Sequence, residues 1–345
     1  MKPFETLTKR GQLSRLKQLG LNALKAYEID EPHFTPLRHE DNTTFRLQTD
    51  RGEQYVLRIH RHPKKTSEMV RSEMMWLDAL HQEDGLIVPE PLPTRDGDLL
   101  TSASADGVPE SRVCVLFRWV PGRFFDDSLR PVHLTRVGAF MARLQQFGAT
   151  FDPPEGFVRG RLDHLCGKPD GISDSLARQQ VDNPEDEAVA IQLVSDVFSP
   201  EEGALISAYI EQVRAAQRSI GYGADVFGLI HGDLHQENYL FHQGQVRAID
   251  FDDCGYGHYL YDMAVTLNNV HWRDDAPELR QAFLDGYRSV RPLSAEHEAH
   301  LDLLIYLREI QIMLWEIEMR NHPAFRDTWE SDAKEVLDDV RKLVA

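Results

Sequence analysis

The feature of this sequence that most constrains its fold is the stretch 229-LIHGDLHQENYLFHQGQVRAIDFDDCGYG-257, where polar side chains alternate with short apolar runs. Most chains scatter such polar groups over a solvated surface. Here the runs YLF and QVRAID flank His242-Gln243-Gly244, a pattern typical of a β-hairpin. The stretch therefore predicts a hairpin with a dense set of polar side chains at its ends: His231, Asp233, His235, Asn238, Asp250, Asp252 and Asp253.

The register of this hairpin predicts a metal site. Asn238 and Asp250 are equally distant in sequence from Gly244, so pairing across the turn would place their side chains opposite each other at the open end. An amide oxygen and a carboxylate aimed at one point suit Mg²⁺, which takes few protein ligands and completes its shell with water and phosphate. Asp233 lies five residues before Asn238, and we expect it near the metal, able to accept a proton from a hydroxyl.

Hydrophobic spacing divides the chain into two parts. Its 345 residues are too many for one compact core. The first part has period-two runs at 43–49, 54–60 and 113–119 and helical spacing at 6–27 and 67–81. After Pro121-Gly122 helical spacing dominates, at 132–148, 203–219, 276–290, 296–320 and 327–344. We therefore predict an α+β protein whose residues 1–120 form a small antiparallel-sheet lobe and whose residues 121–345 form a larger, mainly helical lobe.

The smaller lobe contains a carboxylate in an unusual place. In the expected helix 67–81, Glu73 lies four residues from both Met69 and Leu77, on the apolar stripe. A carboxylate on a buried face is costly unless it is paired. Strand alternation places Val56 and Arg58 on one face of the run 54–60. Arg58 is therefore the cation that we expect opposite Glu73, although an exposed strand arginine is the plainer interpretation.

Three segments together resemble a known family: 231-HGDLHQEN-238, 248-AIDFDD-253 and 261-YDMA-264. They are similar to the aminoglycoside phosphotransferase and choline kinase-like family, in a form closer to its homoserine kinase and stress-response kinase branch. The resemblance implies a bilobal, protein-kinase-like fold. It implies that Asp233 is the catalytic base, that Asn238 and Asp250 bind Mg²⁺, and that Asp262 braces the catalytic loop from a following helix.

The resemblance also implies an ATP site in the lobe of residues 1–120, which ends in a hinge. Arg58, held by Glu73, would orient the phosphates, although this family more often has Lys there. Val56 would lie against the base, and Asn42 would belong to a turn over the phosphates. Backbone groups from Leu116 to Trp119, which include Phe117, would meet the adenine edge. An ordinary turn explains Asn42 equally well, and a buried strand explains 113–119.

We expect the acceptor to bind near the predicted helix 296–320. Its residues Tyr306, Trp315, Glu316 and Glu318 would suit a cationic or hydroxylated metabolite. The preferred interpretation of Trp315 is nevertheless ordinary core, with Leu304, Ile312 and Met319. The resemblance allows an amino alcohol, an aminoglycoside, homoserine or a sugar as acceptor, and as an alternative a protein Ser/Thr. Only twelve positions separate Asp250 from Asp262, which leaves little room for a peptide-docking activation loop and favours the small molecule.

Other classes fit the same residues less well. Gly232-Asp233-Leu234-His235 matches one block of binuclear metallophosphatases, whose other blocks the sequence lacks. His231 and His235 have the spacing of a zinc pair, but Gly232 disfavours the helix that such a pair needs. We instead expect His231 to bond nearby backbone. A non-catalytic kinase-like module is disfavoured because Asp233, Asn238 and Asp250 are all present. Asp252 could hold a second metal or be a solvated acid.

Composition limits partners and location. The formal net charge of −18, from 56 acidic and 38 basic residues, argues against a nucleic-acid partner, which would need a basic face. No apolar run approaches the roughly 18 residues of a membrane span, and the first residues show no secretory signal. Three cysteines far apart in the chain are typical of reduced thiols. We therefore expect a cytoplasmic protein, while the oligomeric state cannot be inferred.

Overall fold

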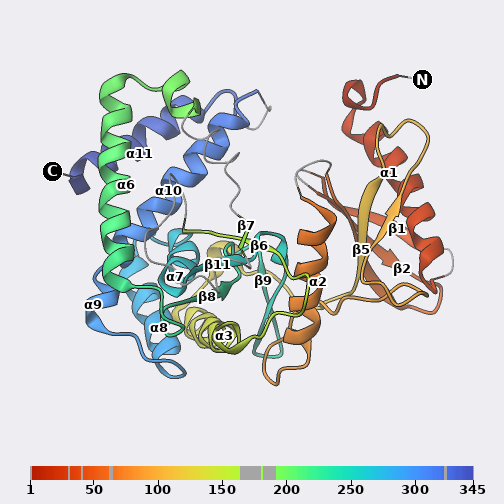
Figure 1. Cartoon of the computed structure of the whole chain (residues 1–345), viewed down its shortest axis with the longest axis horizontal. Coiled ribbons are helices and arrows are strands. Elements are labelled where there is room, and N and C mark those ends of the chain that lie inside the picture. Colours follow the sequence, from red (N-terminus) through yellow and green to blue (C-terminus); the bar gives the residue numbers. More distant parts are fainter. Residues whose placement is uncertain are drawn as a thin grey trace. The chain divides into compact units, whose positions relative to one another are not determined.

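The computed structural model describes residues 2–29, 32–39, 42–61, 65–163, 180–181, 192–321 and 325–344. The chain divides into two compact units (Figure 1). Unit 1 comprises Met1–Gly122, Pro153–Val158 and Arg247–Asp252. Unit 2 comprises Arg123–Asp152, Arg159–Val246 and Asp253–Ala345. Among the residues described, no helix is both long enough and apolar enough to cross a membrane.

Unit 1 contains a five-stranded antiparallel sheet in the order β1-β2-β3-β5-β4. The predicted strands are present as β2 (Thr43–Gln48), β3 (Gln54–Ile59) and β5 (Arg112–Arg118). The sequence did not reveal β1 (His33–His39) or β4 (Thr101–Ala103). Most of β1 is exposed, and its register shifts between Pro36 and Arg38. This edge strand therefore lacks the alternation of buried and exposed residues by which strands are recognised in a sequence.

The two faces of this sheet differ, because successive strand residues point to opposite sides. Leu57 of β3 is buried in an apolar core with helix α1 (Lys9–Ala23), which continues as a short 3₁₀ turn, Leu24–Ala26. Val56 and Arg58 point to the other face, where Val56 lies opposite Phe117 of β5. The charged side chain of Arg58 therefore leaves the sheet on the side away from the α1 core.

Helix α2 (Ser67–His81) matches the predicted helix 67–81. Thr66 caps it, since its side chain accepts a hydrogen bond from the backbone of Met69 at 3.3 Å. The most buried residues of α2 include Trp76, whose ring meets the edge of Phe251 with centroids 5.5 Å apart. Phe251 is itself fully buried. This contact anchors the late segment Arg247–Asp252 within unit 1.

Unit 2 is mainly helical. Its helices include α3 (Pro131–Thr150), α6 (Pro200–Ile220), α7 (Tyr259–Asn268), α8 (Ala276–Arg288), α9 (Ala295–Glu298), α10 (Leu301–Glu318) and α11 (Trp329–Val344). These confirm the helices predicted beyond Pro121-Gly122, except that the predicted helix 296–320 is two helices, α9 and α10.

Short strands lie in the part of the chain between α3 and α7. Strand β8 (Phe227–Ile230) pairs antiparallel with β11 (Gly255–His258). Strand β6 (Arg159–Gly160) pairs with β7 (Gln180–Val181). The predicted hairpin is also present, as β9 (Tyr239–His242) and β10 (Gln245–Ala248). Gln243 and Gly244 at its turn both have positive φ, 49° and 80°, which is typical of a tight hairpin turn.

Two glycines allow α3 and α8 to pack closely. A Cβ added at Gly138 of α3 would lie 2.1 Å from the carbonyl oxygen of Phe283, and one added at Gly286 of α8 would lie 1.9 Å from that of Thr135. No side chain fits at such distances, so the two backbones approach each other directly. This packing holds α3 in place as a support for the candidate site.

Candidate active site

The loop 231–238, between β8 and β9, is irregular rather than helical. Gly232 has a φ of 80°, and a Cβ there would lie 2.9 Å from the carbonyl oxygen of Asp253. Its N–H donates to Oδ1 of Asp262 at 2.9 Å. The backbone N–H of Asp233 donates to Nδ1 of His231 at 3.3 Å. His231 therefore bonds backbone, as predicted, and no helix sets His231 and His235 one turn apart as a zinc pair would need.

Asp262 of α7 braces this loop, as the resemblance implied. Its carboxylate is fully buried, and besides Gly232 it accepts a bond from Nε2 of Gln145 on α3 at 3.3 Å. Gln145 is fixed in turn by the hydroxyl of Tyr287, which donates to its Oε1 at 2.7 Å. Burial raises the pKa of Asp262 to about 6, although the hydrogen bonds that it accepts work in the opposite direction.

Asp233 is held by three side chains of unit 2. Asn238 donates from Nδ2 to its Oδ2 at 3.0 Å and to its backbone carbonyl at 2.8 Å. His235 places Nε2 3.3 Å from Oδ2, and Arg308 of α10 donates to Oδ1. Burial raises the pKa of Asp233, but the His235 contact and the charges of Arg308 and the nearby histidines outweigh burial. The pKa therefore lies below its ordinary value, and the group is an ionised acceptor at neutral pH.

Arg308 is the site residue that the sequence analysis missed. Arg308 lies between Leu307 and Ile310, both of which are buried. A cation within an apolar helical run was therefore the sequence signal that could have revealed it. Arg308 also contacts the hydroxyl of Tyr261, which donates to Oε1 of Gln311 at 2.6 Å. A chain of polar contacts therefore runs from Gln311 through Tyr261 and Arg308 to Asp233.

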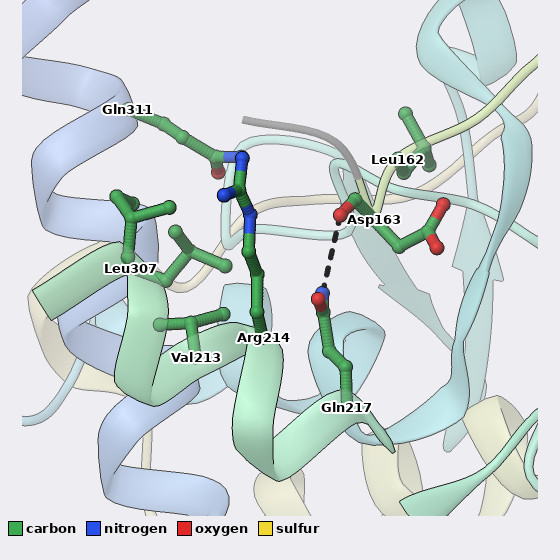
Figure 2. A pocket seen from close by; sticks show the side chains of 8 residues that line it. Leu162, Asp163, Val213, Arg214, Gln217, Leu307 and Gln311 are labelled. Atoms are coloured by element: carbon green, nitrogen blue, oxygen red, sulfur yellow. Dashed lines mark hydrogen bonds between the residues drawn. The ribbon is translucent and has the colours of Figure 1, made fainter. Parts of the chain in front are cut away.

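A small crevice adjoins this chain of contacts. Figure 2 shows Arg214 extending from α6 toward Gln311, and Gln217 donating to the carbonyl of Asp163. The crevice has a volume of about 10 Å³, which is room for no more than a water molecule. It is therefore too small to hold an acceptor.

All four residues considered for acceptor binding, Tyr306, Trp315, Glu316 and Glu318, lie on the same helix, α10. Trp315 is 39% exposed, so the preferred interpretation of it as core was wrong. Its ring instead meets that of Phe325, with centroids 5.0 Å apart. Tyr306 is half-buried and lies against His271. Burial, together with the charges of Asp332 and Glu309, raises the pKa of Glu316.

In unit 1, Arg58 and Glu73 form the predicted pair. Nη2 of Arg58 donates to Oε2 of Glu73 at 2.6 Å, and the two side chains are 4% and 0% exposed. The guanidinium also lies over the ring of Phe117, 5.1 Å from its centre. The plainer alternative, an exposed strand arginine, was therefore wrong.

Asp250 lies beside the same arginine. Its Oδ1 is 3.6 Å from Nη1 of Arg58, and its Oδ2 is 3.9 Å from Nη1 of Arg38. The φ of Asp250 is 62°, in the left-handed region that non-glycine residues rarely adopt. Such backbone strain is concentrated at functional sites. Arg58 thus contacts one carboxylate that is buried and a second that is partly exposed.

Asp252 is not a solvated acid. Nδ2 of Asn42 donates to its Oδ2 at 2.8 Å, Nζ of Lys65 lies 3.1 Å from the same oxygen, and His60 lies 3.8 Å from Oδ1. Asn42 accepts the N–H of Arg61 at 3.3 Å. Asn42 therefore ties Asp252 to the end of β3, and its expected role over the phosphates remains a prediction.

The other residues expected at the nucleotide lie on the same sheet. Val56 is half-buried and Phe117 is buried. The guanidinium of Arg46 lies over the ring of Trp119, 4.8 Å from the ring centre. The backbone N–H of Trp119, the residue after β5, donates to the backbone carbonyl of Gln54. Val56 and Arg58 share a face with Phe117, so an apolar surface lies next to the cation.

The donor set suits a hard divalent cation. Both donor contacts of the Asn238 amide nitrogen go to Asp233, and neither of them uses the amide oxygen. Asp250 offers a partly exposed carboxylate. Oxygen donors of this kind fit Mg²⁺. Asn238 belongs to unit 2 and Asp250 to unit 1, so their predicted meeting at one metal remains a prediction.

Comparison with known proteins places the chain in a family. The sequence profile of the phosphotransferase enzyme family (APH) matches residues 33–300. The amicoumacin kinase of Bacillus subtilis (strain 168) is 24% identical over 79% of this chain and 76% of that protein. The homoserine kinase of Polaromonas naphthalenivorans (strain CJ2) is 27% identical over 76% of this chain and 74% of that protein.

Solved structures agree with these relatives. A microcompartment-associated aminopropanol kinase has a TM-score of 0.76 and 25% identity, over 94% of this chain and 97% of that one. The amicoumacin kinase hAmiN, in complex with AMP-PNP, Ca²⁺ and Ami, has a TM-score of 0.76 and 21% identity, over 96% of both chains. The predicted fold class, an antiparallel sheet with a larger helical part, is confirmed. The chain therefore belongs to the phosphotransferase enzyme family and is a kinase that acts on a hydroxyl acceptor.

Proposed function

We propose that this protein transfers the γ-phosphoryl group of ATP to a hydroxyl of a small molecule. In this reaction the bond between the γ-phosphorus and the β,γ-bridging oxygen breaks, and a bond from the acceptor oxygen to the same phosphorus forms. The hydroxyl proton passes to the carboxylate of Asp233. The products are ADP and a phosphomonoester of the acceptor.

The observation that carries this proposal is the position of Arg58 between two carboxylates. Glu73 holds Nη2, while Nη1 lies near Asp250. A phosphotransferase needs a fixed cation for the phosphates, a carboxylate to position that cation, and a further carboxylate for the metal. Unit 1 supplies all three within one cluster. We assign phosphate binding to Arg58, and we expect Val56, Phe117, Trp119 and Asn42 to line the rest of the nucleotide site.

In this proposal, Asn238 and Asp250 hold a Mg²⁺ ion, which would neutralise charge on the phosphates. Asn238 then has two tasks, because its amide nitrogen also orients Asp233. Arg308 and His235 keep Asp233 ionised and fix its direction. Since phosphoryl transfer involves little covalent chemistry by the protein, positioning and charge neutralisation supply most of the rate.

The class of acceptor follows from the relatives rather than from one contact. The relatives named above are kinases of amicoumacin, homoserine and aminopropanol. The exposed ring of Trp315 and the acid Glu316 on α10 would suit an amine that also carries a hydroxyl. We therefore propose an amino alcohol or a related hydroxylated amine as acceptor, in place of a protein Ser/Thr.

The first experiment is ADP release from Mg·ATP by the wild type and by Asp233→Asn. Amino alcohols, homoserine and aminoglycosides are tested in one arm and a protein fraction in the other, with GTP replacing ATP in a parallel set. ADP that depends on the small acceptors and on Asp233 supports the proposal. ADP that depends only on the protein fraction would establish the protein kinase instead. ADP formation equal in the two enzymes would remove Asp233 from its role.

A further inference from the structure

Unit 2 has a second cavity, which the proposed reaction does not use. Its volume is about 250 Å³, and its lining includes Arg123, Phe125, Arg130, His133, Arg136 and Phe241. This volume is near the lower end of small-molecule sites, which typically have 300–1,000 Å³. None of these residues takes part in the clusters around Asp233 or Arg58.

Backbone and ring contacts fix the wall of the cavity. Arg123 and Phe241 form a two-way backbone bridge, with N–H to carbonyl distances of 3.1 and 3.0 Å. The guanidinium of Arg123 lies over the ring of Phe125, 4.7 Å from the ring centre. Phe125 also stacks on His133, with centroids 4.2 Å apart. The ring of Phe125 therefore contacts both the guanidinium of Arg123 and the ring of His133.

The other two arginines belong to the N-terminal part of helix α3. Arg130 is the N-terminal cap of α3, and its N–H donates to Nδ1 of His133 at 3.0 Å. Arg136 lies over the turn of the β9–β10 hairpin, since a Cβ added at Gly244 would be 3.8 Å from its Nη1. The positive end of the α3 dipole adds to the charge of the guanidinium groups here.

The positive charge of the cavity is not compensated. Among the described side chains, no carboxylate lies within 4.0 Å of the guanidinium groups of Arg123, Arg130 or Arg136. Arginines elsewhere commonly have such partners, as Arg161 and Arg280 do. Burial lowers the pKa of His133, and the charges of Arg130, Arg136 and Arg123 lower it further. Three neighbouring arginines without a carboxylate partner among the described side chains, in a chain of net charge −18, form a positive cluster that an anion would stabilise.

We propose that this cavity binds a small ligand through a phosphate group. Guanidinium groups donate pairs of parallel hydrogen bonds, which match the oxygens of a phosphate. Three of them around one cavity suit a dianion better than a single carboxylate. The shared chemistry is a phosphate, either as inorganic phosphate or as a phosphomonoester, and the site is separate from the residues assigned to phosphoryl transfer.

The test is calorimetric titration of the full-length protein at constant ionic strength, with inorganic phosphate in one arm and glycerol 2-phosphate in the other. The variant is Arg130→Gln/Arg136→Gln. The control is Arg143→Gln, which removes one positive charge, half of that removed by the double variant, from an exposed position of α3 outside the cavity. We expect the variant to bind at least about ten-fold more weakly, since each arginine donates charge-assisted hydrogen bonds, and the control to bind as the wild type does.

The two probes separate the sources of the phosphate. Binding of both means that free phosphate suffices, whereas binding of glycerol 2-phosphate alone indicates an organic phosphate ligand. The proposal is overturned if the wild type binds neither probe, if the double variant binds as tightly as the wild type, or if Arg143→Gln weakens binding equally. Acceptor-dependent ADP formation should be unchanged in all variants, so failure here would leave the proposed kinase activity standing.

Discussion

Each unit places an arginine–carboxylate pair in its part of the candidate site, and these two pairs differ in exposure. The side chains of Arg58 and Glu73 in unit 1 are 4% and 0% exposed, whereas those of Arg308 and Asp233 in unit 2 are 23% and 19% exposed. A buried pair is strongly destabilised when one partner is removed, because the other charge is left without compensation. A partly exposed pair can be opened by a substrate. The first arrangement suits a fixed phosphate anchor and the second suits a group that must exchange protons.

The largest expected effect concerns Asp233. We expect Asp233→Asn to lower kcat by about three orders of magnitude, because the amide cannot accept the hydroxyl proton. Nucleotide affinity, which we assign to unit 1, should change by less than about three-fold. Steady-state kinetics and calorimetry with AMP-PNP measure the two quantities. The control is Asp338→Asn, which changes an exposed carboxylate of α11 paired with Arg341. Near-normal turnover of Asp233→Asn would show that the Arg308–Asp233 pair does not contain the catalytic base.

The buried pair should dominate stability. Glu73→Gln leaves the charge of Arg58 without its carboxylate partner, and we expect it to lower the free energy of unfolding by about 3–5 kcal/mol. The matched control is Glu90→Gln, whose partner Arg118 is 54% exposed and whose loss should cost less than about 1 kcal/mol. Urea unfolding measures both. Equal losses in the two variants would show that burial does not distinguish the pairs.

Asp262, the buried carboxylate that braces the loop 231–238, should make the stability of the protein depend on pH. The pKa of Asp262 is raised to about 6 in the folded protein, above its unfolded value of about 3.9. Between these values the folded state binds more protons, so the contribution of Asp262 to stability is greatest below pH 4 and falls as pH rises through 6. We expect a fall of about 3 kcal/mol over the whole of this range.

Asp262→Asn should remove this part of the pH dependence, because the amide does not titrate. Urea unfolding of both proteins at pH 4.5, 5.5 and 7 gives the difference directly. A wild-type stability that runs parallel to that of the variant over this range would contradict the raised pKa.

The smallest effect on activity is expected for Arg308, in the partly exposed pair with Asp233. Arg308→Gln removes a charge that lowers the pKa of Asp233, so that pKa should rise. Since the base must be ionised, the acidic limb of the kcat profile should move to higher pH, and turnover at neutral pH should fall by about ten-fold or less. Arg214→Gln, at the small crevice, is the control. A lower kcat with an unmoved acidic limb would assign Arg308 to structure alone.

Periodicity predicted the regular elements well where one side of an element is buried. Helix α2 matches its predicted bounds, and β2, β3 and β5 appear where the alternation placed them. Strand β1 was missed because its exposed, polar residues carry no alternation. Helix α7 is buried throughout, so it has no polar face and gave no helical period.

The candidate site was predicted only in part, because its residues come from distant segments. The position of Glu73 on an apolar stripe was enough to predict its pairing with Arg58. Arg308 carried a similar signal, a cation among buried apolar residues, but nothing in the sequence pointed to its partner Asp233, 75 positions away. The contacts of Asp252 with Asn42 and Lys65 were likewise invisible, so the sequence left that acid undecided.

The amino-acid sequence by itself determined the fold class, the family and the identity of the candidate acid and metal ligands. These depend on local spacing, such as the five positions from Asp233 to Asn238, and on hydrophobic period. Only the tertiary structure decided which charges are paired and how deeply. The contacts with His235 and Arg308 lower the pKa of Asp233, and burial raises that of Asp262. Among the described side chains, Arg123, Arg130 and Arg136 have no carboxylate partner. The reason is that burial and Coulomb energy depend on distances in space, which residue spacing along the chain does not contain.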